Sequence, residues 1–367
     1  MKRAILTVIL LPLAMSAFAQ QYTVDSENPD MLRFSDHHEP ARREIVLPDQ
    51  VGGYNVYKAD LHTHTMFSDG SVTPQFRVRE AWLEGLDVIA ITDHIEYRPF
   101  EKNMSEYISA RDKKDPDLDL PVELAQESGE YWDVFVIPGT EITRDGRTIG
   151  HFNALFTRNN NKIYDDDPLQ AIRNAKRQGA LVMHNHPGWW RKSIDYTDVE
   201  KAAYDEGLID GVEVINYNEF YPGIIDRVRE HGLFISANTD VHESSTLDFN
   251  SHGFMRPITL ILASERTEKS LREALEAGRT LAFGFNTLCG SEQLLKDFFK
   301  ASVGVRKISR EVYMMTNNTC VPYLLQFGSG NPVRLDPFST IRLSGEPVFK
   351  VLNMFCGKEA HPVIDYK

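Results

Sequence analysis

Asp60-Leu61-His62-Thr63-His64 is the stretch of this chain from which the fold can be worked out. In an extended strand successive side chains point to opposite faces, so Asp60, His62 and His64 share one face. Three titratable groups on one strand face are costly to desolvate unless something pairs with them. A divalent metal is one such partner, because imidazole and carboxylate are both metal ligands. A polar strand end with solvated histidines is the alternative.

The bulk composition bounds the class of protein. Hydrophobic residues make up 42% of the 367 residues, enough for a sizeable core and against global disorder. The formal net charge is −13. That charge argues against general binding to nucleic acid or to anionic membranes, which require clustered Lys and Arg. We therefore expect no nucleic-acid polymer as a partner.

Residues 1–19 have the pattern of a secretory signal peptide. Lys2 and Arg3 precede a short apolar run, and Ala17-Phe18-Ala19 fits the small-x-small cleavage rule. The apolar run is too short to span a membrane, and no other segment is expected to span one. The sequence predicts cleavage after Ala19 and a periplasmic or secreted protein.

The chain has three cysteines, Cys289, Cys320 and Cys356. An odd number in an oxidising compartment leaves at least one thiol free or paired with another molecule. Cys320 and Cys356 both lie in the C-terminal segment and are candidates for a disulfide. Their spacing does not resemble a zinc knuckle.

Residues 54–290 alternate apolar strands with amphipathic helices. The predicted strands are Asn55–His62, Asp87–His94, Val134–Thr143, Ala180–His186, Gly211–Tyr217, Leu233–Asp240, Ile258–Ala263 and Thr280–Phe285. The predicted helices are Pro74–Glu84, Pro168–Gln178, Asp198–Glu206, Phe220–Glu230 and Glu268–Ala277. Near-continuous apolar strands between helices predict a parallel sheet covered by helices, and seven or eight units favour a closed α/β barrel. An extra strand, Gly150–Phe156, is expected to form a hairpin with Val134–Thr143.

Three other regions flank or interrupt the barrel. Residues 20–53 are predicted to form a polar N-terminal arm. Residues 95–130 form a charged insert, either a lid over the barrel mouth or a plain surface excursion. Residues 291–367 are predicted to form a helix, Glu292–Ala301, and a small β-rich domain. Its expected strands are Glu311–Thr316, Val321–Phe327, Ser339–Leu343 and Val348–Phe355.

Polar residues collect where the predicted barrel strands end. These strand-end residues are Asp93, His94, Glu141, His184, His186, Asp240 and His242, and His151 lies in the hairpin. Parallel barrels place catalytic residues at the carboxyl ends of several strands. A single strand-end histidine is often only a hydrogen-bonded loop residue, but five such strand ends argue for a shared site.

Several of these stretches resemble, in order, the motifs of the PHP superfamily, named for polymerase and histidinol phosphatase. The matching stretches are His62-Thr63-His64, Thr92-Asp93-His94, Glu141, His186-Pro187-Gly188 and Asp240-Val241-His242. The resemblance covers residues 56–285. It implies a distorted (β/α)7 TIM-like barrel with two or three divalent metal ions at the strand ends, and phosphoester hydrolysis as the default chemistry. The stretches around Pro138–Glu141 and Gly150–Asn153 are most similar to exported, stand-alone members.

The resemblance also implies the ligand sets. The first metal would take His62, His64, Glu141 and Asp240; the second Glu141, His151 and His186; the third Asp69, His94 and His242. Several relatives have His where this chain has Asp69, which can change the preferred metal. Catalytic roles are implied for Glu141, Asp240 and His242. The mixed donors suit Zn, Mn or Fe.

Three further residues are expected around these ligands. His184 lies two residues before His186 and is an alternative to His151. Asp60 and Asp93 are expected to orient a ligand histidine through its other ring nitrogen, with local turn capping as the alternative. Two ions about 3.5–4 Å apart can hold a hydroxide and polarise a phosphoryl oxygen, so no Ser or Cys nucleophile is required.

Substrate contacts are expected on the loop after His186. Arg191 is a candidate for binding phosphate, and Trp189 for stacking on a sugar or base, although the loop can equally pack on the lid. Arg144 is a further candidate, with Arg147, Asn216 and His252 left open.

The leading hypothesis is an exported metal-dependent phosphoesterase acting on a small phosphorylated substrate. One alternative is a metal-dependent hydrolase of amide, carbamate or lactone bonds on the same scaffold. The other is a non-catalytic binding protein that keeps its metals for structure.

Overall fold

The computed structural model describes residues 22–24, 28–34, 41–100, 117–142 and 145–366. The predicted signal peptide, residues 1–19, and Arg144 lie outside these residues. The chain divides into two compact units, Met1–Ala41 and Arg42–Lys367. In the first, β1 (Tyr22–Val24) and β2 (Leu32–Phe34) form a two-stranded antiparallel sheet. Among the described residues, no helix has the length and apolar character needed to cross a bilayer.

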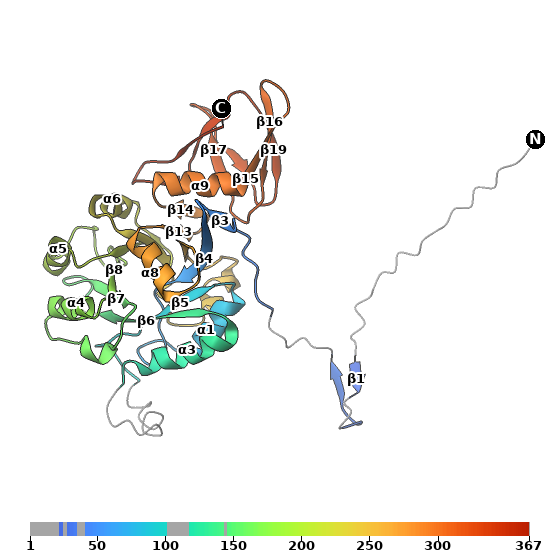
Figure 1. Ribbon diagram of the computed structural model, residues 1–367. Coiled ribbons are helices and arrows are strands. Elements are labelled where there is room, and N and C mark those ends of the chain that lie inside the picture. Colours follow the sequence, from blue (N-terminus) through green and yellow to red (C-terminus); the bar gives the residue numbers. More distant parts are fainter. Residues whose placement is uncertain (1–21, 25–27, 35–40, 101–116, 143–144, 367) are drawn as a thin grey trace, which may run out of the picture. The chain divides into compact units, whose positions relative to one another are not determined.

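The second unit is built on a curled sheet (Figure 1). Its strands are β4 (Tyr54–Asp60), β5 (Val88–Ile91), β6 (Phe135–Ile142), β7 (His151–Leu155), β8 (Leu181–Asn185), β9 (Gly211–Asn216) and β11 (Phe234–Asn238). Neighbours run parallel except β7, which is antiparallel to β6 and β8. Just beyond β4 and β11, Thr63 bridges to Val241, so the sheet closes on itself at the carboxyl ends of the strands. The distorted α/β barrel and its hairpin are confirmed.

The last two predicted barrel strands have a different role. β12 (Ile258–Ala263) runs antiparallel to both β4 and β13 (Thr280–Gly284). The Thr259 hydroxyl bonds the Ala237 amide and carbonyl of β11, and the Thr280 hydroxyl bonds those of Ile235. Side chains therefore join β11 to these strands. A strand buried on both faces is apolar in either direction, so the sequence pattern could not reveal the reversal.

The helices lie around the outside of the curled sheet (Figure 1). They are α1 (Pro74–Leu83), α3 (Leu120–Trp132), α4 (Pro168–Arg177), α5 (Asp198–Asp205), α6 (Pro222–His231), α7 (Ser245–Asp248), α8 (Glu268–Glu276) and α9 (Glu292–Ser302). Short 3-10 turns span Asn160–Lys162 and Asn250–His252, and two-residue strands are β3 (Gln50–Val51) and β10 (Glu219–Phe220). Side-chain caps set several starts: the Thr73 side chain accepts from the Phe76 amide, and Thr197 forms a capping box with Glu200.

The carboxyl half of the charged insert is a helix. α3 packs against α1 and buries Leu120, Leu124 and Ala125. The sequence analysis did not predict this helix. Residues 101–116 of the insert lie outside the described part of the chain.

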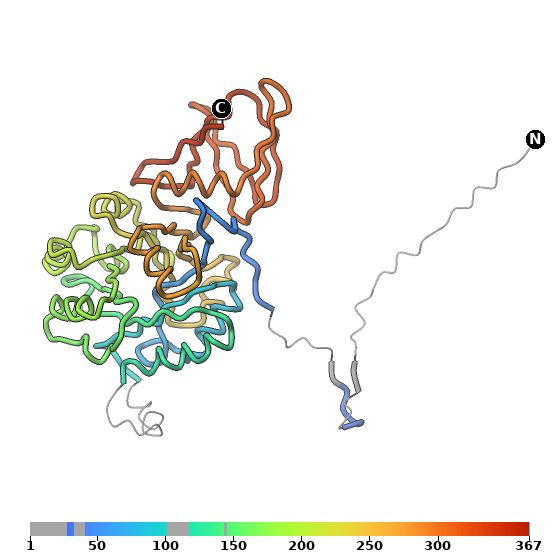
Figure 2. Tube along the Cα trace, in the orientation of Figure 1, coloured from blue at the N-terminus to red at the C-terminus, as the bar shows by residue number. Residues whose placement is uncertain are grey.

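The C-terminal region is β-rich, as predicted, and is continuous with the barrel core. One sheet contains β15 (Val303–Lys307), β16 (Val312–Asn317) and β19 (Thr340–Ser344); the other contains β18 (Val333–Leu335), β17 (Tyr323–Gln326), β20 (Val348–Val351) and β22 (Val363–Asp365). β21 (Met354–Phe355) pairs with β14 (Thr287–Cys289) of the barrel sheet. Phe298 and Phe299 of α9 belong to a buried cluster that includes both Leu260 and Tyr323. Figure 2 traces the chain through α9 into these strands.

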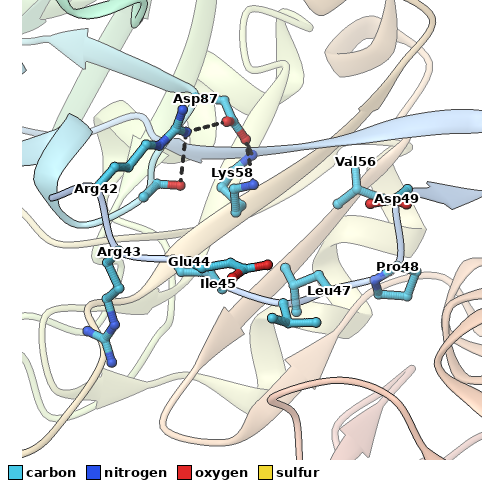
Figure 3. A pocket seen from close by; sticks show the side chains of 12 residues that line it. Arg42, Arg43, Glu44, Ile45, Leu47, Pro48, Asp49, Val56, Lys58 and Asp87 are labelled. Carbon is cyan, nitrogen blue, oxygen red and sulfur yellow. Dashed lines mark hydrogen bonds and ion pairs between the residues drawn. The ribbon is translucent and has the colours of Figure 1, made fainter.

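Two details lie away from the strand ends that carry the site. At the amino end of β5, Asp87 receives Arg42 Nη2 at 2.7 Å and Lys58 Nζ at 3.0 Å, beside a cavity of about 430 Å³ (Figure 3). The segment 42–49 is thereby tied to the barrel.

All three cysteines are free, and no disulfide joins Cys320 to Cys356.

Candidate metal centre

The carboxyl ends of the barrel strands bring all of the predicted ligands together. The convergent groups, whose ligand atoms lie within 4.8 Å of one another, are His64, Asp69, His94 and His242; His62, Glu141 and His186; and His62, His64 and Asp240. His64 lies between the first and third predicted positions. The structure therefore places residues far apart in sequence around one small volume.

Glu141 occupies the middle of this cluster. It is fully buried near the end of β6. Its Oε2 lies 2.8 Å from His94 Nδ1, 3.4 Å from His64 Nε2 and 3.5 Å from His62 Nε2. Its Oε1 lies 3.4 Å from His151 Nδ1 and 3.8 Å from His186 Nε2. The two oxygens face different histidines, which is the arrangement that a bridging carboxylate requires.

Asp240 and Asp69 complete the two sides. Asp240 Oδ1 lies 3.2 Å from His62 Nε2 and 3.0 Å from His64 Nε2. Asp69 Oδ1 lies 3.2 Å from His242 Nε2 and 3.4 Å from His94 Nε2. Each carboxylate thus shares its volume with two imidazoles.

Four ligand atoms in this volume are buried without a hydrogen-bond partner. They are His62 Nε2, His64 Nε2, Asp69 Oδ1 and Glu141 Oε2. Buried polar atoms in native proteins are almost always paired, because leaving one unpaired costs about 1–3 kcal/mol. Divalent cations would satisfy all four atoms. The donor set, imidazole nitrogens with carboxylate oxygens, fits Zn, Mn or Fe.

The electrostatics of the metal-free cluster follow from this crowding. Burial lowers the pKa of His64 to about 3, helped by the neighbouring His242 and His94. Burial also acts to lower the pKa of His94, but Glu141 and Asp69 outweigh it and raise that pKa to about 10. His64 is therefore neutral and ready to ligate at pH 7, whereas His94 must lose a proton first.

Glu213, in the middle of β9, is a functional residue that the sequence analysis missed. Its Oε1 lies 2.9 Å from His62 Nδ1 and accepts from Asn238 Nδ2 at 2.9 Å. Its Oε2 accepts from the His186 amide at 2.7 Å and from Asn216 Nδ2 at 2.9 Å. A charged residue within an otherwise apolar buried strand was the available signal.

Asp60 and Asp93 accept from backbone amides and hydroxyl groups, and Asp60 also pairs with Arg256, but neither carboxylate contacts an imidazole ring of the described residues. Asp60 accepts from the amides of His62 and Thr239. Asp93 accepts from the Thr65 amide at 2.7 Å and from Ser68 Oγ at 2.6 Å. Neither carboxylate bonds a ring nitrogen, so the expected orienting role is wrong and the capping alternative is closer.

His184 does not reach the cluster. Its Nε2 lies 2.9 Å from Glu200 Oε1 and its Nδ1 lies 3.1 Å from the Tyr204 hydroxyl. The alternation of β8 ends before His186, which has a φ of +24°. Asn185 instead turns inward and donates to Glu141 Oε1 at 2.8 Å. The prediction that His184 can replace His151 is therefore wrong.

The loop after His186 supplies one wall beside the centre. The Trp189 ring lies 5.3 Å from the His186 ring and 5.5 Å from the His151 ring, centroid to centroid. Arg191, expected to bind phosphate, is instead paired with Glu200 through both terminal nitrogens. Arg147 stacks over Trp190.

A cavity of about 360 Å³ adjoins the centre. It is lined by Trp189, Asn216, Tyr217, Asn218, Glu219, Asp240, His242, Glu243 and Asp248. Two of these, Asp240 and His242, belong to the ligand cluster. Asn216 and His252 are among the possible substrate contacts that the sequence leaves open. Asn216 lines this cavity, whereas His252 does not.

Comparison with known proteins agrees with this geometry. Residues 60–212 match the family model of the PHP domain. Two uncharacterized proteins of Methanocaldococcus jannaschii are similar. MJ1295 is 34% identical over 182 residues, which are 48% of this chain and 65% of that protein, so the match spans less than two thirds of its length. MJ1587 is 30% identical over 174 residues, 43% of this chain and 81% of that protein.

A solved structure extends the likeness to the C-terminal region. It is a two-domain protein of Bacteroides vulgatus containing a predicted PHP-like metal-dependent phosphoesterase. It is 31% identical with a TM-score of 0.79, covering 88% of this chain and 98% of that one. The family match, these relatives and the convergent strand-end ligands place this chain in the PHP domain family.

Proposed function

We propose that this protein is a metal-dependent phosphoesterase that hydrolyses a small organic phosphate or phosphodiester with a metal-activated water. The observation that carries the proposal is the set of unpaired buried atoms, His62 Nε2, His64 Nε2, Asp69 Oδ1 and Glu141 Oε2. Each of these atoms lies within 3.2 Å of another ligand group of the cluster, so bound cations would satisfy all four atoms together.

The ligand sets are the ones that the resemblance to the PHP superfamily implies, and His151 joins the second set through its contact with Glu141. His62, His64, Glu141 and Asp240 would hold one ion; Glu141, His151 and His186 a second; Asp69, His94 and His242 a third. When bound, divalent ions supply Lewis acidity and lower the pKa of water. This chemistry requires no nucleophilic side chain.

Residues of this chain would orient the ligand side chains and offset the charge of the ions. Glu213 fixes the ring of His62 so that its Nε2 faces the cluster. Glu141 and Asp240 would offset cationic charge in the centre, and their negative charge is retained because surrounding histidines lower the pKa of both, against the effect of burial.

The adjoining cavity suits the organic part of a substrate. Trp189 and Tyr217 offer aromatic faces, and Asn216 and Asn218 offer amides. Among the residues that the structure describes, the lining of this cavity includes no Lys or Arg. A substrate phosphate would therefore depend on the metal ions, and the cavity volume of about 360 Å³ favours a small leaving group.

A phosphoester panel tests the proposal. Wild-type protein supplied with Zn, Mn or Fe should release phosphate from 4-nitrophenyl phosphate or an alkyl phosphate, or should release 4-nitrophenol and 4-nitrophenyl phosphate from bis-4-nitrophenyl phosphate. Glu141→Ala and His94→Ala should each reduce turnover at least about 100-fold, because each variant removes a side chain that would bind an ion directly. His252→Ala, outside the cavity lining, is the matched histidine control.

The alternatives predict different results. An amide, carbamate or lactone hydrolase would release acid and no phosphate from a matched panel. A non-catalytic binding protein would gain thermal stability from metal while the ligand variants left every turnover unchanged. Either result would exclude phosphoester hydrolysis as the activity.

Export is a second part of the proposal and is supported by the sequence of residues 1–19. Cell fractionation after expression with the full sequence should recover a mature form that begins at Gln20. A cytoplasmic full-length product would contradict it.

A further inference from the structure

The ligand-bearing loops depart from their strands with strained backbone. His186 has a φ of +24° and Asp240 a φ of +54°, both left-handed for residues with a Cβ. Trp190, in the loop after His186, has a φ of +56°. Such conformations cost about 1–3 kcal/mol each and persist only where surrounding contacts hold them. Two buried charged residues supply such contacts. Glu200 bonds Arg191 of the loop after His186, and Arg77 bonds the Val241 carbonyl next to Asp240.

Glu200, in the first turn of α5, gathers the loops on one side. Its side chain is fully buried. Its Oε1 lies 2.9 Å from His184 Nε2, and its Oε2 accepts from Arg191 Nη1 and from the Thr197 amide, both at 2.9 Å. Both oxygens are thus used by groups from two different segments, β8 with its following loop and the start of α5.

The contacts of Glu200 reach the loop that carries His186. Arg191 ends a pair of turns in which the Trp189 amide bonds the His186 carbonyl at 2.9 Å and the Arg191 amide bonds the Gly188 carbonyl at 3.0 Å. The salt bridge between Arg191 and Glu200 therefore fixes the far end of this loop. Trp189, between the two ends, packs on the His186 ring.

The same carboxylate touches the backbone next to His151. Gly150, the preceding residue, has a φ of +102°, and a Cβ there would lie 2.6 Å from Glu200 Oε1. Thr197, the helix cap that bonds Glu200, donates its hydroxyl to the Ile149 carbonyl at 2.9 Å. The start of β7 is thus packed against the start of α5 with no room for a side chain at position 150.

Arg77 plays the corresponding part on the other side of the centre. This fully buried side chain of α1 donates its Nε to the His64 carbonyl at 3.1 Å. Its Nη2 bonds the Val241 carbonyl at 3.2 Å and its Nη1 bonds the Glu243 carbonyl at 2.8 Å. One guanidinium therefore joins the loop after β4 to the loop after β11, which carries Asp240 and His242.

We propose that Glu200 is a positioning residue for the His151 and His186 half of the metal centre, acting independently of Arg77, which positions the His64, Asp240 and His242 half. This inference rests on the proposed function. It adds that Glu200 and Arg77 support different ligand loops, so loss of one support should weaken metal binding in one half more than in the other, although Glu213 and Glu141 contact both halves.

Metal binding to the full chain tests the proposal directly. Metal-free wild type, Glu200→Gln and Arg77→Lys are titrated with Zn or Mn by calorimetry, and bound metal is counted by elemental analysis after gel filtration. We expect Glu200→Gln to weaken one binding event about 10- to 100-fold and leave the other events within about twofold. Arg77→Lys should weaken a different event. The variant combining both should show both losses.

Glu206→Gln is the matched control. Glu206 lies at the other end of α5 and also pairs with an arginine, Arg173, through two bonds, at 2.6 and 2.9 Å. It contacts none of the ligand loops through these bonds. Its metal titration should match that of wild type, which separates the position of Glu200 from the general loss of an ion pair on α5.

Kinetics supply a second readout. Because Trp189 lines the cavity and is held through Arg191, Arg191→Met should raise the KM for an aryl phosphate more than it lowers kcat. Arg191→Met also decides the case if Glu200→Gln fails to fold, because it removes the same salt bridge and leaves Glu200 bonded to His184 and Thr197.

The outcomes are distinguishable. A folded Glu200→Gln with the complete wild-type titration, or Glu200→Gln and Arg77→Lys weakening the same event, would overturn the inference while leaving the proposed function intact. A wild type that binds no metal would overturn both. If Arg191→Met changes neither the metal titration nor KM, the positioning role of this salt bridge is excluded.

Discussion

The Nδ1 atom of His62 lies 2.9 Å from Oε1 of Glu213, and both side chains are fully buried. Burial acts to lower the pKa of His62, but Asp240, Glu213 and Glu141 outweigh it and raise that pKa. Because Glu213 holds the proton on Nδ1, Nε2 is the nitrogen that would lose its proton and bind a metal. Glu213→Gln keeps the shape but weakens this preference for a proton on Nδ1. We expect metal affinity to fall about 10- to 100-fold, measured by competition with a chelator of known affinity.

The control for this prediction is Glu276→Gln. Glu276 is half exposed and pairs with Arg272 on the surface of α8. The Glu276→Gln variant should bind metal with the affinity of the wild-type protein. If Glu213→Gln binds metal as tightly as this control does, the carboxylate does not act through His62.

Metal binding should release protons at neutral pH. In the metal-free protein Glu141 and Asp69 outweigh burial and raise the pKa of His94 to about 10, so His94 carries a proton at pH 7. A metal displaces that proton. Affinity should therefore rise with pH by about tenfold per unit up to that pKa, for each proton displaced.

Calorimetry in two buffers of different ionisation enthalpy measures the release. The His94→Ala variant should release about one proton fewer than wild type at pH 7. His252→Ala should behave as wild type. A binding heat that does not depend on the buffer would rule out the protonated resting state of His94.

The strand-end ligands could be predicted from sequence, but their supporting residues could not. His62, Glu141 and Asp240 follow apolar runs, and strand ends of a barrel converge whatever the loop lengths. Glu200 lies on a helix where an acidic residue is ordinarily solvated, and only the packing of α5 on Gly150 shows that it is buried. The pairing of Arg191 with Glu200 could not be predicted either, because this partner is nine residues away along an irregular loop.

Strand direction was a second limit. β12 and β13 were predicted in the right places, but their antiparallel pairing depends on how the chain crosses the barrel after β11. Apolar periodicity does not encode that path. The continuity of the C-terminal β-rich region with the barrel core also appears only when Phe298 and Leu260 are seen in one cluster.

Arg256 should be essential for stability although it lies outside the ligand set. Its fully buried guanidinium pairs with Asp60 at 2.5 Å and with Glu84 at 2.8 Å. Arg256→Met would leave two carboxylates buried without their cation. Breaking a buried pair in this way costs about 3–5 kcal/mol, so we expect a loss of that size in the free energy of unfolding from urea titration.

Arg266→Met is the comparison for Arg256. Arg266 pairs with the largely exposed Asp133, and an exposed pair contributes about 0–1 kcal/mol. Equal losses for the two variants would mean that the buried network beneath β4 contributes no more than a surface ion pair.

The shared core predicts that the barrel and the C-terminal β-rich region unfold together. Phe298 of α9 is completely buried in the cluster that spans both regions. Phe298→Ala should cost about 3–5 kcal/mol and lower the melting temperature in a single transition, since the cavity it leaves borders both regions. Phe338→Ala removes a ring that is 61% exposed in the same region and should change the free energy of unfolding by no more than about 0.5 kcal/mol. Two separate transitions in the calorimetric trace of Phe298→Ala, one of them at the wild-type temperature, would show that the two regions are stable independently.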